Sequence, residues 1–293
     1  MIKRTLLFNS PCRITVKDEQ LVVENRNSGE IKKAPIEDIG VVLLENPMTS
    51  ISIPALNALS AVNCAVVLCD SGHLPSSMLM NLNSNSIQGE RYRQQIEAAL
   101  PVKKGLWKQI IQAKIKNQSR LLFEMGLDGN LLKPYYSNVK SGDADNREGV
   151  SAKLYWDLLM GEGFIRDRYG EEPNPMLNYG YSILRAGMAR AIMGSGLFPA
   201  FGLFHKNRYN AFPLADDLME PYRPYVDQVV VQLMKEGKTG LDSETKQRLL
   251  RILFIDTKFK EMTRPLEIAL SITTASLAKC FAGESKTIEY PML

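Results

Sequence analysis

NLNSNS, residues 81–86, marks the point at which the sequence pattern of this 293-residue chain changes. Clusters of Asn and Ser are typical of turns and linkers, because these side chains bond to nearby backbone groups. Short apolar runs before this stretch predict strands, whereas apolar residues after it recur at helical spacing. We therefore predict an α+β fold with a small N-terminal β-rich domain (residues 1–80), a linker (81–87) and a larger all-helical C-terminal domain (88–293).

The β-rich part contains segments with strand patterns and a segment with a helical pattern. Asp18 and Glu19 lie in a short polar turn between two alternating segments, which predicts a hairpin. Nearly continuous apolar runs are typical of buried strands. The predicted strands are RITV (13–16), QLVVEN (20–25), IGVVLLEN (39–46) and CAVVLCD (64–70), and the predicted helix is ISIPALNALSAVN (51–63).

Helical periodicity dominates the rest of the chain. One predicted helix has its apolar face at Leu177, Tyr181, Leu184 and Met188 and ends at Gly194 and Gly196. A long helix is predicted between Pro101 and Gly126. Two more are predicted in SETKQRLLRILFIDTKF (243–259) and PLEIALSITTASLAKCFAG (265–283).

The composition is that of an ordinary globular protein, 45% apolar and 23% charged. The longest apolar stretch, residues 52–69, is interrupted by Asn57 and Asn63 and does not fit a membrane span. The first residues, MIKRTLLFNSPCR, become polar too early for a secretory signal. Four cysteines without paired metal spacing indicate reduced thiols, so we expect a cytoplasmic protein with no membrane partner.

Charge is unevenly distributed along the chain, whose formal net charge is +4. Residues 1–80 contain 7 Lys and Arg against 8 Asp and Glu, a balance of −1, and the remainder contains 29 against 24, a balance of +5. A positive half that also contains an acidic cluster is what a metal site on a polyanion-binding surface needs. The glycine motifs of dinucleotide and Walker-type phosphate sites, and the hydrolase motif GxSxG, are absent from the sequence.

The acidic cluster lies in PLADDLMEPYRP, residues 213–224. On a helix, Glu220 shares a face with either Asp216 or Asp217, and like charges so close repel unless a cation lies between them. Aspartates in a first helical turn also satisfy free backbone amides, which is the commoner role. His205, one of two histidines in the chain, lies just upstream. A lone histidine after an apolar run is more often a satisfied core side chain, so both interpretations stay open.

A further carboxylate occurs in SGDADNREGVSAKLYWDLL, residues 141–159. Asp145 and Glu148 have the spacing of a capping box, in which the first residue caps the helix and the second bonds back to its amide. From this spacing alone, Glu148 is predicted to be a helix cap.

Basic residues recur in steps of four or eight along the long helix predicted between Pro101 and Gly126. Such a row can follow a phosphate backbone, although a solvated helix face is the commoner meaning of a charge run. The row consists of Lys104, Lys108, Lys116 and Arg120, with Lys103 and Lys114 beside it.

Four segments together resemble one family, the CRISPR adaptation integrases (CRISPR-associated protein one), in the version found in type II systems. The segments are REGVSAKLYW (147–156), LNYGYSILRA (177–186), GLFHKNRYN (202–210) and PLADDLMEPYRP (213–224). Glu148 precedes His205 by 57 residues, and His205 precedes Glu220 by 15, in the family's order and spacing. The β-rich half fits through VVLLEN, the ISIPALNAL helix and VVLCDSGHLPSS, so the resemblance covers essentially the whole chain.

The resemblance implies that residues 88–293 form a metal-dependent catalytic domain. It implies that Glu148, His205 and Glu220 bind one divalent ion, Mg²⁺ or Mn²⁺, with Asp217 as a ligand or directly behind one. An imidazole beside two carboxylates favours Mn²⁺. The candidate phosphate contacts near the metal are Lys206, Arg208 and Arg223, and the more distant candidates are Lys104, Lys108, Lys116 and Arg120.

The implied activity is spacer acquisition, in which the 3′-hydroxyls of short foreign DNA duplexes are joined to the CRISPR repeat by transesterification. With water as the nucleophile the same site cleaves nucleic acid, so a stand-alone metal-dependent nuclease is a second interpretation. A non-catalytic DNA-binding scaffold is a third. The implied partners are double-stranded DNA, a second copy paired through the β-rich domain, the second CRISPR-associated protein in a heterohexameric complex, and the type II effector nuclease.

Overall fold

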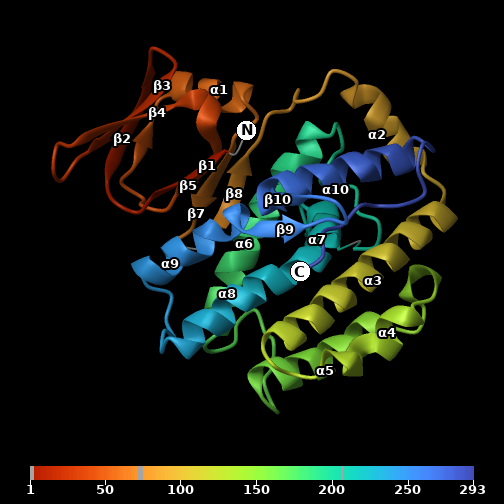
Figure 1. Ribbon diagram of the computed structural model, residues 1–293. Coiled ribbons are helices and arrows are strands. Elements are labelled where there is room, and N and C mark those ends of the chain that lie inside the picture. The colour runs from red at the N-terminus through yellow and green to blue at the C-terminus, as the bar shows by residue number, and fades with distance from the viewer. Residues whose placement is uncertain (1–2, 72–74, 206) are drawn as a thin grey trace. The chain divides into compact units, whose positions relative to one another are not determined.

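The computed structural model describes residues 3–71, 75–205 and 207–293, and the chain divides into two compact units, residues 1–86 and 87–293 (Figure 1). The first unit is built mainly of strands and the second mainly of helices, which confirms the predicted fold class. Among the described residues, no helix is both long enough and apolar enough to cross a membrane.

Within the described residues of the first unit, one sheet has the strand order β1-β5-β7-β8 and another has the order β4-β3-β2-β6. The strands are β1 (Arg4–Phe8), β2 (Cys12–Lys17), β3 (Gln20–Asn25), β4 (Ile31–Pro35), β5 (Ile39–Leu44), β6 (Ser50–Ile51), β7 (Ala65–Cys69) and β8 (Pro75–Leu79), and the helix is α1 (Ile53–Ala61). The core between them contains Phe8, Ile14, Leu21, Ile39, Val42, Leu59 and Val66.

Local sequence accounts for these strands. β2 and β3 pair antiparallel, and the two turn residues Asp18 and Glu19 have φ values of 50° and 58°, which suit the tight turn of a twisted hairpin. β5 lies between two parallel neighbours, β1 and β7, and is buried along its whole length, as expected of a continuous apolar run. The predicted hairpin, the buried strand β5 and α1 are confirmed, whereas β7 is buried only in its first half, because Leu68 is 45% exposed.

The second unit consists of helices packed around α6 and α3. Its helices are α2 (Gln88–Glu97), α3 (Leu100–Glu124), α4 (Lys133–Ser137), α5 (Arg147–Met160), α6 (Asn174–Gly194), α7 (Pro213–Met219), α8 (Arg223–Lys235), α9 (Ser243–Leu250) and α10 (Leu266–Phe281), and its strands are β9 (Asp256–Lys258) and β10 (Thr263–Pro265). α6 contacts α7, α8, α9 and α10, whereas α3 contacts α5 and α8.

The helix predicted over residues 243–259 is wrong in its second half. α9 ends at Leu250, and a short 3₁₀ segment then leads into β9. β9 pairs antiparallel with β10, and the buried Thr257 hydroxyl donates to the Arg264 carbonyl oxygen at 2.8 Å. β-Branched residues such as Ile255 and Thr257 favour strands over helices. The apolar periodicity therefore predicted a helix that continues too far toward the C-terminus.

A buried carboxyl group joins three helices of this unit. Asp227 in α8 accepts hydrogen bonds from the hydroxyl groups of Tyr155 in α5, at 2.6 Å, and Tyr181 in α6, at 2.5 Å. Burial raises the pKa of Asp227 from 3.8 to about 6, although the two hydroxyl groups act in the opposite direction.

We expect the contribution of Asp227 to stability to fall as the pH rises from about 4 to about 6. Over this range the folded protein holds a proton on Asp227 that the unfolded chain has released, so low pH favours the folded state. The pKa difference corresponds to about 3 kcal/mol of unfolding free energy. The unfolding free energies of wild type and Asp227→Asn are measured by guanidinium unfolding at pH 4 and pH 7. Relative to the variant, the wild type should lose about 3 kcal/mol between the two pH values. The same free-energy difference between the two proteins at both pH values would contradict the prediction.

Candidate active site

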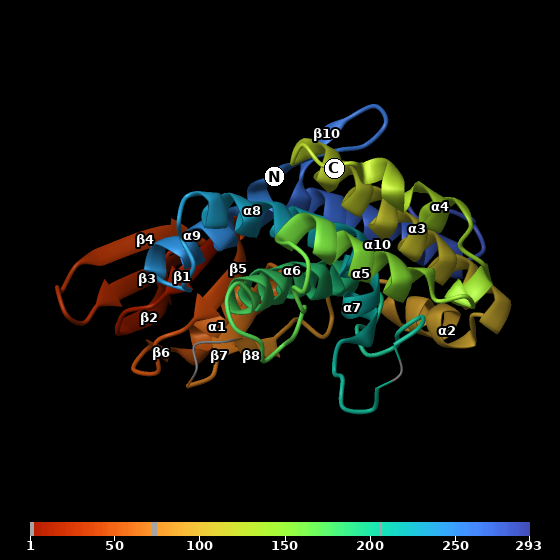
Figure 2. The same cartoon turned by 90° about the horizontal axis from the view of Figure 1, so that it is seen from below.

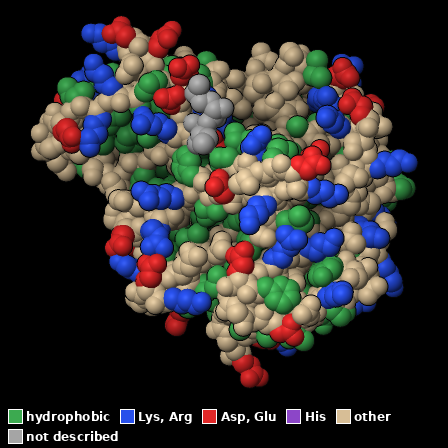
Figure 3. All heavy atoms as spheres, in the orientation of Figure 1, with side chains coloured by type: hydrophobic (Ala, Val, Ile, Leu, Met, Phe, Trp, Pro, Cys, Tyr) green, Lys and Arg blue, Asp and Glu red, His purple; other side chains and the backbone are tan. Residues whose placement is uncertain are grey.

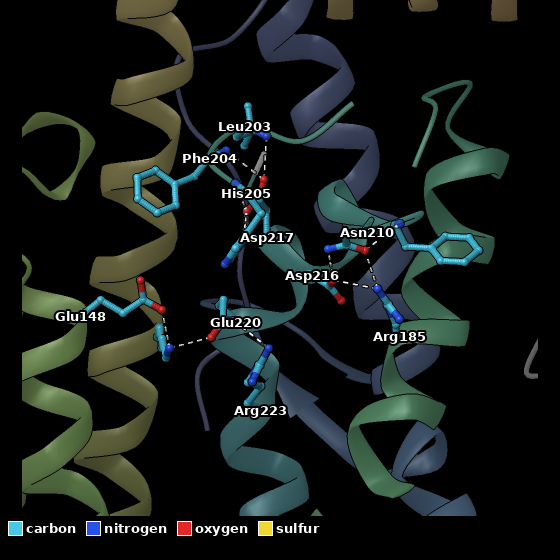
Figure 4. Close-up of polar contacts among 12 residues, drawn as sticks. Glu148, Arg185, Leu203, Phe204, His205, Asn210, Asp216, Asp217, Glu220 and Arg223 are labelled. Atoms are coloured by element: carbon cyan, nitrogen blue, oxygen red, sulfur yellow. Dashed lines mark hydrogen bonds and ion pairs between the residues drawn. The ribbon is translucent and has the colours of Figure 1, made fainter. Parts of the chain in front are cut away.

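The acidic cluster of residues 213–224 spans α7, the turn that follows it and the start of α8. α7 ends just before Glu220, where a 3₁₀ turn containing Pro221 begins and leads into α8. Figure 4 shows the three carboxylates turned toward different partners. The backbone nevertheless stays in the right-handed helical region through Met219 and Glu220, and the carboxylates of Asp217 and Glu220 both raise the pKa of His205. That Glu220 shares a face with an aspartate therefore stays a prediction.

Asp216 faces α6 and the loop before α7. Its Oδ2 accepts hydrogen bonds from Arg185 Nη2 at 2.8 Å and from Asn210 Nδ2 at 2.7 Å. The start of α7 has no side-chain cap, and Asp217 also bonds elsewhere. The prediction that the two aspartates satisfy first-turn amides is therefore wrong.

Asp217 holds His205 in place. Asp217 is fully buried, and its Oδ1 lies 2.5 Å from His205 Nδ1 and accepts the His205 amide at 3.3 Å. Its Oδ2 accepts the backbone amides of Leu203 at 2.6 Å and Phe204 at 3.0 Å. The hydrogen bond with Asp217 raises the pKa of His205 above its ordinary value, against the lowering effect of burial. Because Nδ1 is engaged, Nε2 is the ring nitrogen available to a ligand.

Aromatic rings support the same loop. Trp107 of α3 stacks on Phe204 with a centroid distance of 4.4 Å, and it meets the His205 ring edge-on at 5.7 Å. Figure 2 shows the loop before α7 extending from the helices. The side chain of His205 is 39% exposed, which does not fit the alternative of a satisfied core histidine.

Glu148 reaches the site because it is not used as a cap. α5 begins at Arg147, and the N-cap residue is Asn146, whose side chain accepts a first-turn amide at 3.3 Å. Asp143 accepts the amides of Arg147 and Glu148, and Asp145 pairs with the Arg147 side chain. The predicted capping box of Asp145 and Glu148 is therefore wrong, and the Glu148 carboxylate faces α3 instead.

Lys114 of α3 lies between two of the predicted ligands. Its Nζ is 2.7 Å from Glu148 Oε1 and 2.6 Å from Glu220 Oε2, and the residue is 8% exposed. Its predicted place beside an exposed basic row is wrong. The sequence contained a signal for this, because Lys114 follows Trp107 by seven residues and Ile110 by four, which puts it on the apolar face of the helix.

The basic residues predicted near the metal have different surroundings. Arg223 pairs with Glu220 Oε1 at 2.9 Å, and its guanidinium also stacks on a tyrosine ring of α6. Arg208 lies in the loop before α7, with its guanidinium 4.7 Å from the centre of the exposed Tyr209 ring. Lys206 lies outside the described residues.

The basic row on α3 is only partly exposed. Lys104 and Lys116 are exposed, whereas Lys108 and Arg120 are half-buried. Arg120 donates to the Leu293 carbonyl oxygen at 3.2 Å. Figure 3 shows Lys and Arg side chains gathered over the face of the second unit on which α3 lies. The role of this row in DNA binding stays a prediction.

The residues present fit a divalent ion, although they are not arranged as a finished ligand set. In the described part of the chain, no three His, Cys, Asp or Glu side chains lie close enough to hold a metal ion as they stand. Figure 4 shows Glu148, His205 and Glu220 on three sides of one space. Glu220 Oε2 is buried beside the ammonium of Lys114 but accepts no hydrogen bond of good geometry. Two carboxylates and an imidazole are suitable ligands for Mg²⁺ or Mn²⁺. A metal ion at Glu220 Oε2 would not need the directional geometry that a hydrogen-bond donor needs.

Comparison with known proteins points to one family. A family model described as CRISPR associated protein Cas1 matches residues 5–267. The CRISPR-associated endonuclease Cas1 of Neisseria meningitidis serogroup C (strain 8013) is 37% identical over 257 residues, which cover 86% of this chain and 84% of that protein.

Two solved structures share the fold. A casposase bound to integration product has a TM-score of 0.81 at 19% identity, with 98% of this chain and 92% of that chain covered. A Cas6-RT-Cas1–Cas2 complex has a TM-score of 0.76 at 19% identity, with 97% of this chain and 35% of that chain covered. At these identities the likeness extends to the fold alone, whereas the family model spans nearly the whole sequence. The chain therefore belongs to the Cas1 family of CRISPR-associated proteins.

Proposed function

We propose that the protein is a metal-dependent DNA integrase of CRISPR adaptation, which joins the 3′-hydroxyls of short foreign duplexes to the CRISPR repeat by transesterification. The observation that carries the proposal is a His205 ring oriented by Asp217 beside two carboxylates, Glu148 and Glu220, that already share a cation. The Neisseria relative is named an endonuclease, and the similar casposase structure is bound to an integration product. Both names support chemistry on nucleic-acid strands.

Glu148, Glu220 and the Nε2 atom of His205 are the proposed ligands of Mg²⁺ or Mn²⁺. A divalent ion held there would polarise a phosphodiester and offset the charge that develops on its oxygens. The protein's own residues orient the ligands before an ion binds. Asp217 fixes the imidazole through Nδ1, and the stacked aromatic pair from α3 and the loop shields one side of the ring.

The charge balance of the site suits a polyanionic substrate. With His205 neutral, four described carboxylates face three cations, so the balance is −1. The carboxylates are Glu148, Asp216, Asp217 and Glu220, and the cations are Lys114, Arg185 and Arg223. A divalent ion would remove the net negative charge, since the balance is then +1 with Lys114 and 0 without it, and a phosphate backbone would no longer be repelled. Arg208, Arg223 and Lys206 near the site, and Lys104, Lys108, Lys116 and Arg120 on α3, are the proposed phosphate contacts.

The proposed assembly follows the family resemblance. The β-rich domain of residues 1–80 is proposed to pair two copies into a homodimer, and the second CRISPR-associated protein completes a heterohexamer. A complex that contains Cas2 is among the structures with a similar fold, which supports this partner. Membership of a type II system, and the link to its effector nuclease, rest on the sequence resemblance.

A stand-alone metal-dependent nuclease is the second candidate function, and the name of the Neisseria relative favours it. The scaffold interpretation has less support. It explains Glu148, Asp216 and Asp217 as helix caps, and in the structure these carboxylates face Lys114, Arg185 and His205 instead.

A strand-joining assay tests the proposal. The protein and its neighbouring partner are mixed with a short duplex that has free 3′-hydroxyls and a supercoiled plasmid that contains a repeat. We expect joined product with Mn²⁺, none with EDTA, and a loss of about 10³-fold or more in His205→Ala, because a lost metal ligand removes several kcal/mol of transition-state stabilisation.

Glu236→Gln, which breaks an exposed pair with Arg248, is the control and should join DNA at the wild-type rate. Joining that survives in His205→Ala would exclude His205 as a ligand. Metal-dependent nicking without joining, abolished in His205→Ala, would favour the nuclease.

A further inference from the structure

Lys114 takes the position between two carboxylates that a metal ion is expected to take. It comes from the buried face of α3, whereas Glu148 comes from α5 and Glu220 from the turn before α8. Its Nζ lies 2.7 Å and 2.6 Å from one oxygen of each carboxylate. The dashed lines drawn from Glu148 and Glu220 in Figure 4 mark ion pairs at these two carboxylates.

Both oxygens of Glu220 are engaged by cations. Oε2 contacts Lys114, and Oε1 contacts Arg223 at 2.9 Å. Lys114 Nζ therefore lies within ion-pair distance of both carboxylates, and Arg223 contacts the other oxygen of Glu220.

A divalent ion and this ammonium cannot occupy the gap together. Mg²⁺ binds carboxylate oxygens at about 2.0–2.1 Å, a shorter distance than the 2.7 Å and 2.6 Å contacts that Nζ makes with the same two oxygens. An ion placed on both oxygens would therefore overlap the nitrogen, and the two positive charges would repel in a site where solvent screens little.

We propose that Lys114 is a resident counter-ion of the metal site, which holds Glu148 and Glu220 together in the metal-free protein and leaves the gap when a divalent ion binds both. The inference rests on the proposed function, because it takes Glu148 and Glu220 as the metal ligands. Without Lys114, the buried Glu220 carboxylate and the half-buried Glu148 carboxylate would repel each other, because Arg223 contacts Glu220 on its other oxygen. Lys114 therefore keeps the ligands in place at the cost of competing with the metal.

Lys114→Met tests this directly, because methionine keeps an unbranched apolar stem and removes the ammonium. The dissociation constant for Mn²⁺ is measured by isothermal titration calorimetry, and the unfolding temperature is measured with and without Mn²⁺. We expect Lys114→Met to bind Mn²⁺ on the order of tenfold more tightly than wild type, since a competing charge has gone. We also expect a lower unfolding temperature without metal and a larger rise on adding Mn²⁺.

Lys153→Met is the matched control, since it removes an exposed lysine from α5, the helix that provides Glu148, and should leave the Mn²⁺ affinity unchanged. Lys114→Gln repeats the test with a neutral side chain that can still donate a hydrogen bond, should methionine prevent folding. Unchanged or weaker Mn²⁺ binding in both Lys114 variants, with normal binding in wild type, would overturn the inference alone. Absence of Mn²⁺ and Mg²⁺ binding in every protein would overturn it together with the metal site of the proposed function.

Discussion

Asp217→Asn is expected to reduce strand joining by about 100-fold or more in a protein that remains folded. Asp217 accepts three backbone amides, from residues 203–205, and bonds His205 Nδ1. Asparagine has one oxygen and one NH₂ group, and the NH₂ group is itself a donor. Depending on the amide orientation, it faces either the amides of Leu203 and Phe204 or the amide and ring N–H of His205. Each unpaired buried donor costs about 1–3 kcal/mol, and groups that orient a metal ligand are worth about 10–100-fold in metal affinity or activity.

The histidine tautomer gives this substitution a second effect. If the new NH₂ group donates to His205 Nδ1, the proton of a neutral ring must move to Nε2. Nε2 then has no lone pair for a metal ion. The alternative amide orientation preserves the tautomer only by breaking the backbone bonds of Leu203 and Phe204, which loosens the loop.

Two measurements separate these outcomes from general damage. The joining rate is compared with that of Asp216→Asn, which changes the adjacent carboxylate but leaves the amides of residues 203–205 paired. Trypsin cleavage after the exposed-loop residue Arg208 reports whether the loop has loosened, and it should be faster in Asp217→Asn. Equal losses in both variants would show that charge near the site matters rather than the orientation of His205.

Much of the fold could be predicted because its determinants are local. Alternation and the Asp18–Glu19 turn define a hairpin, and apolar spacing defines α3, α6 and α10 within windows of the sequence itself. The exception at residues 251–258 has a non-local cause. β9 forms because β10 is available to pair with it, and no helical periodicity within residues 243–259 contains that information.

The site depended on contacts between distant segments, which local patterns do not contain. The spacing of Asp145 and Glu148 matches a capping box, yet Asn146 adopts a positive φ of 50° and becomes the cap. The Glu148 carboxylate instead accepts a hydrogen bond from Lys114, which lies 34 residues away in the sequence. His205 and Glu220 were identified through the family resemblance, whereas the burial of Lys114 could have been predicted from the apolar face of α3.

Glu220→Gln is expected to abolish strand joining and to lower the unfolding free energy. Glu220 is 3% exposed and pairs with both Lys114 and Arg223. Removing one member of a buried ion cluster leaves the others without compensation, which costs about 3–5 kcal/mol. The neutral amide is also a poor metal ligand, so joining should fall by about 10³-fold or more, beyond what the loss of stability explains.

The comparison must therefore be made where Glu220→Gln is still folded. Circular dichroism sets the assay temperature below its unfolding transition, and Glu236→Gln, which breaks an exposed pair with Arg248, should leave joining unchanged.

In the double variant Lys114→Met with Glu220→Gln, the losses of unfolding free energy should not add, because the two residues share one contact. If the losses of unfolding free energy in the two single variants add fully in the double variant, Lys114 and Glu220 do not stabilise each other. Joining that persists in folded Glu220→Gln would exclude Glu220 from the proposed metal site, because a carboxylate that can be neutralised without loss of activity is not binding an ion.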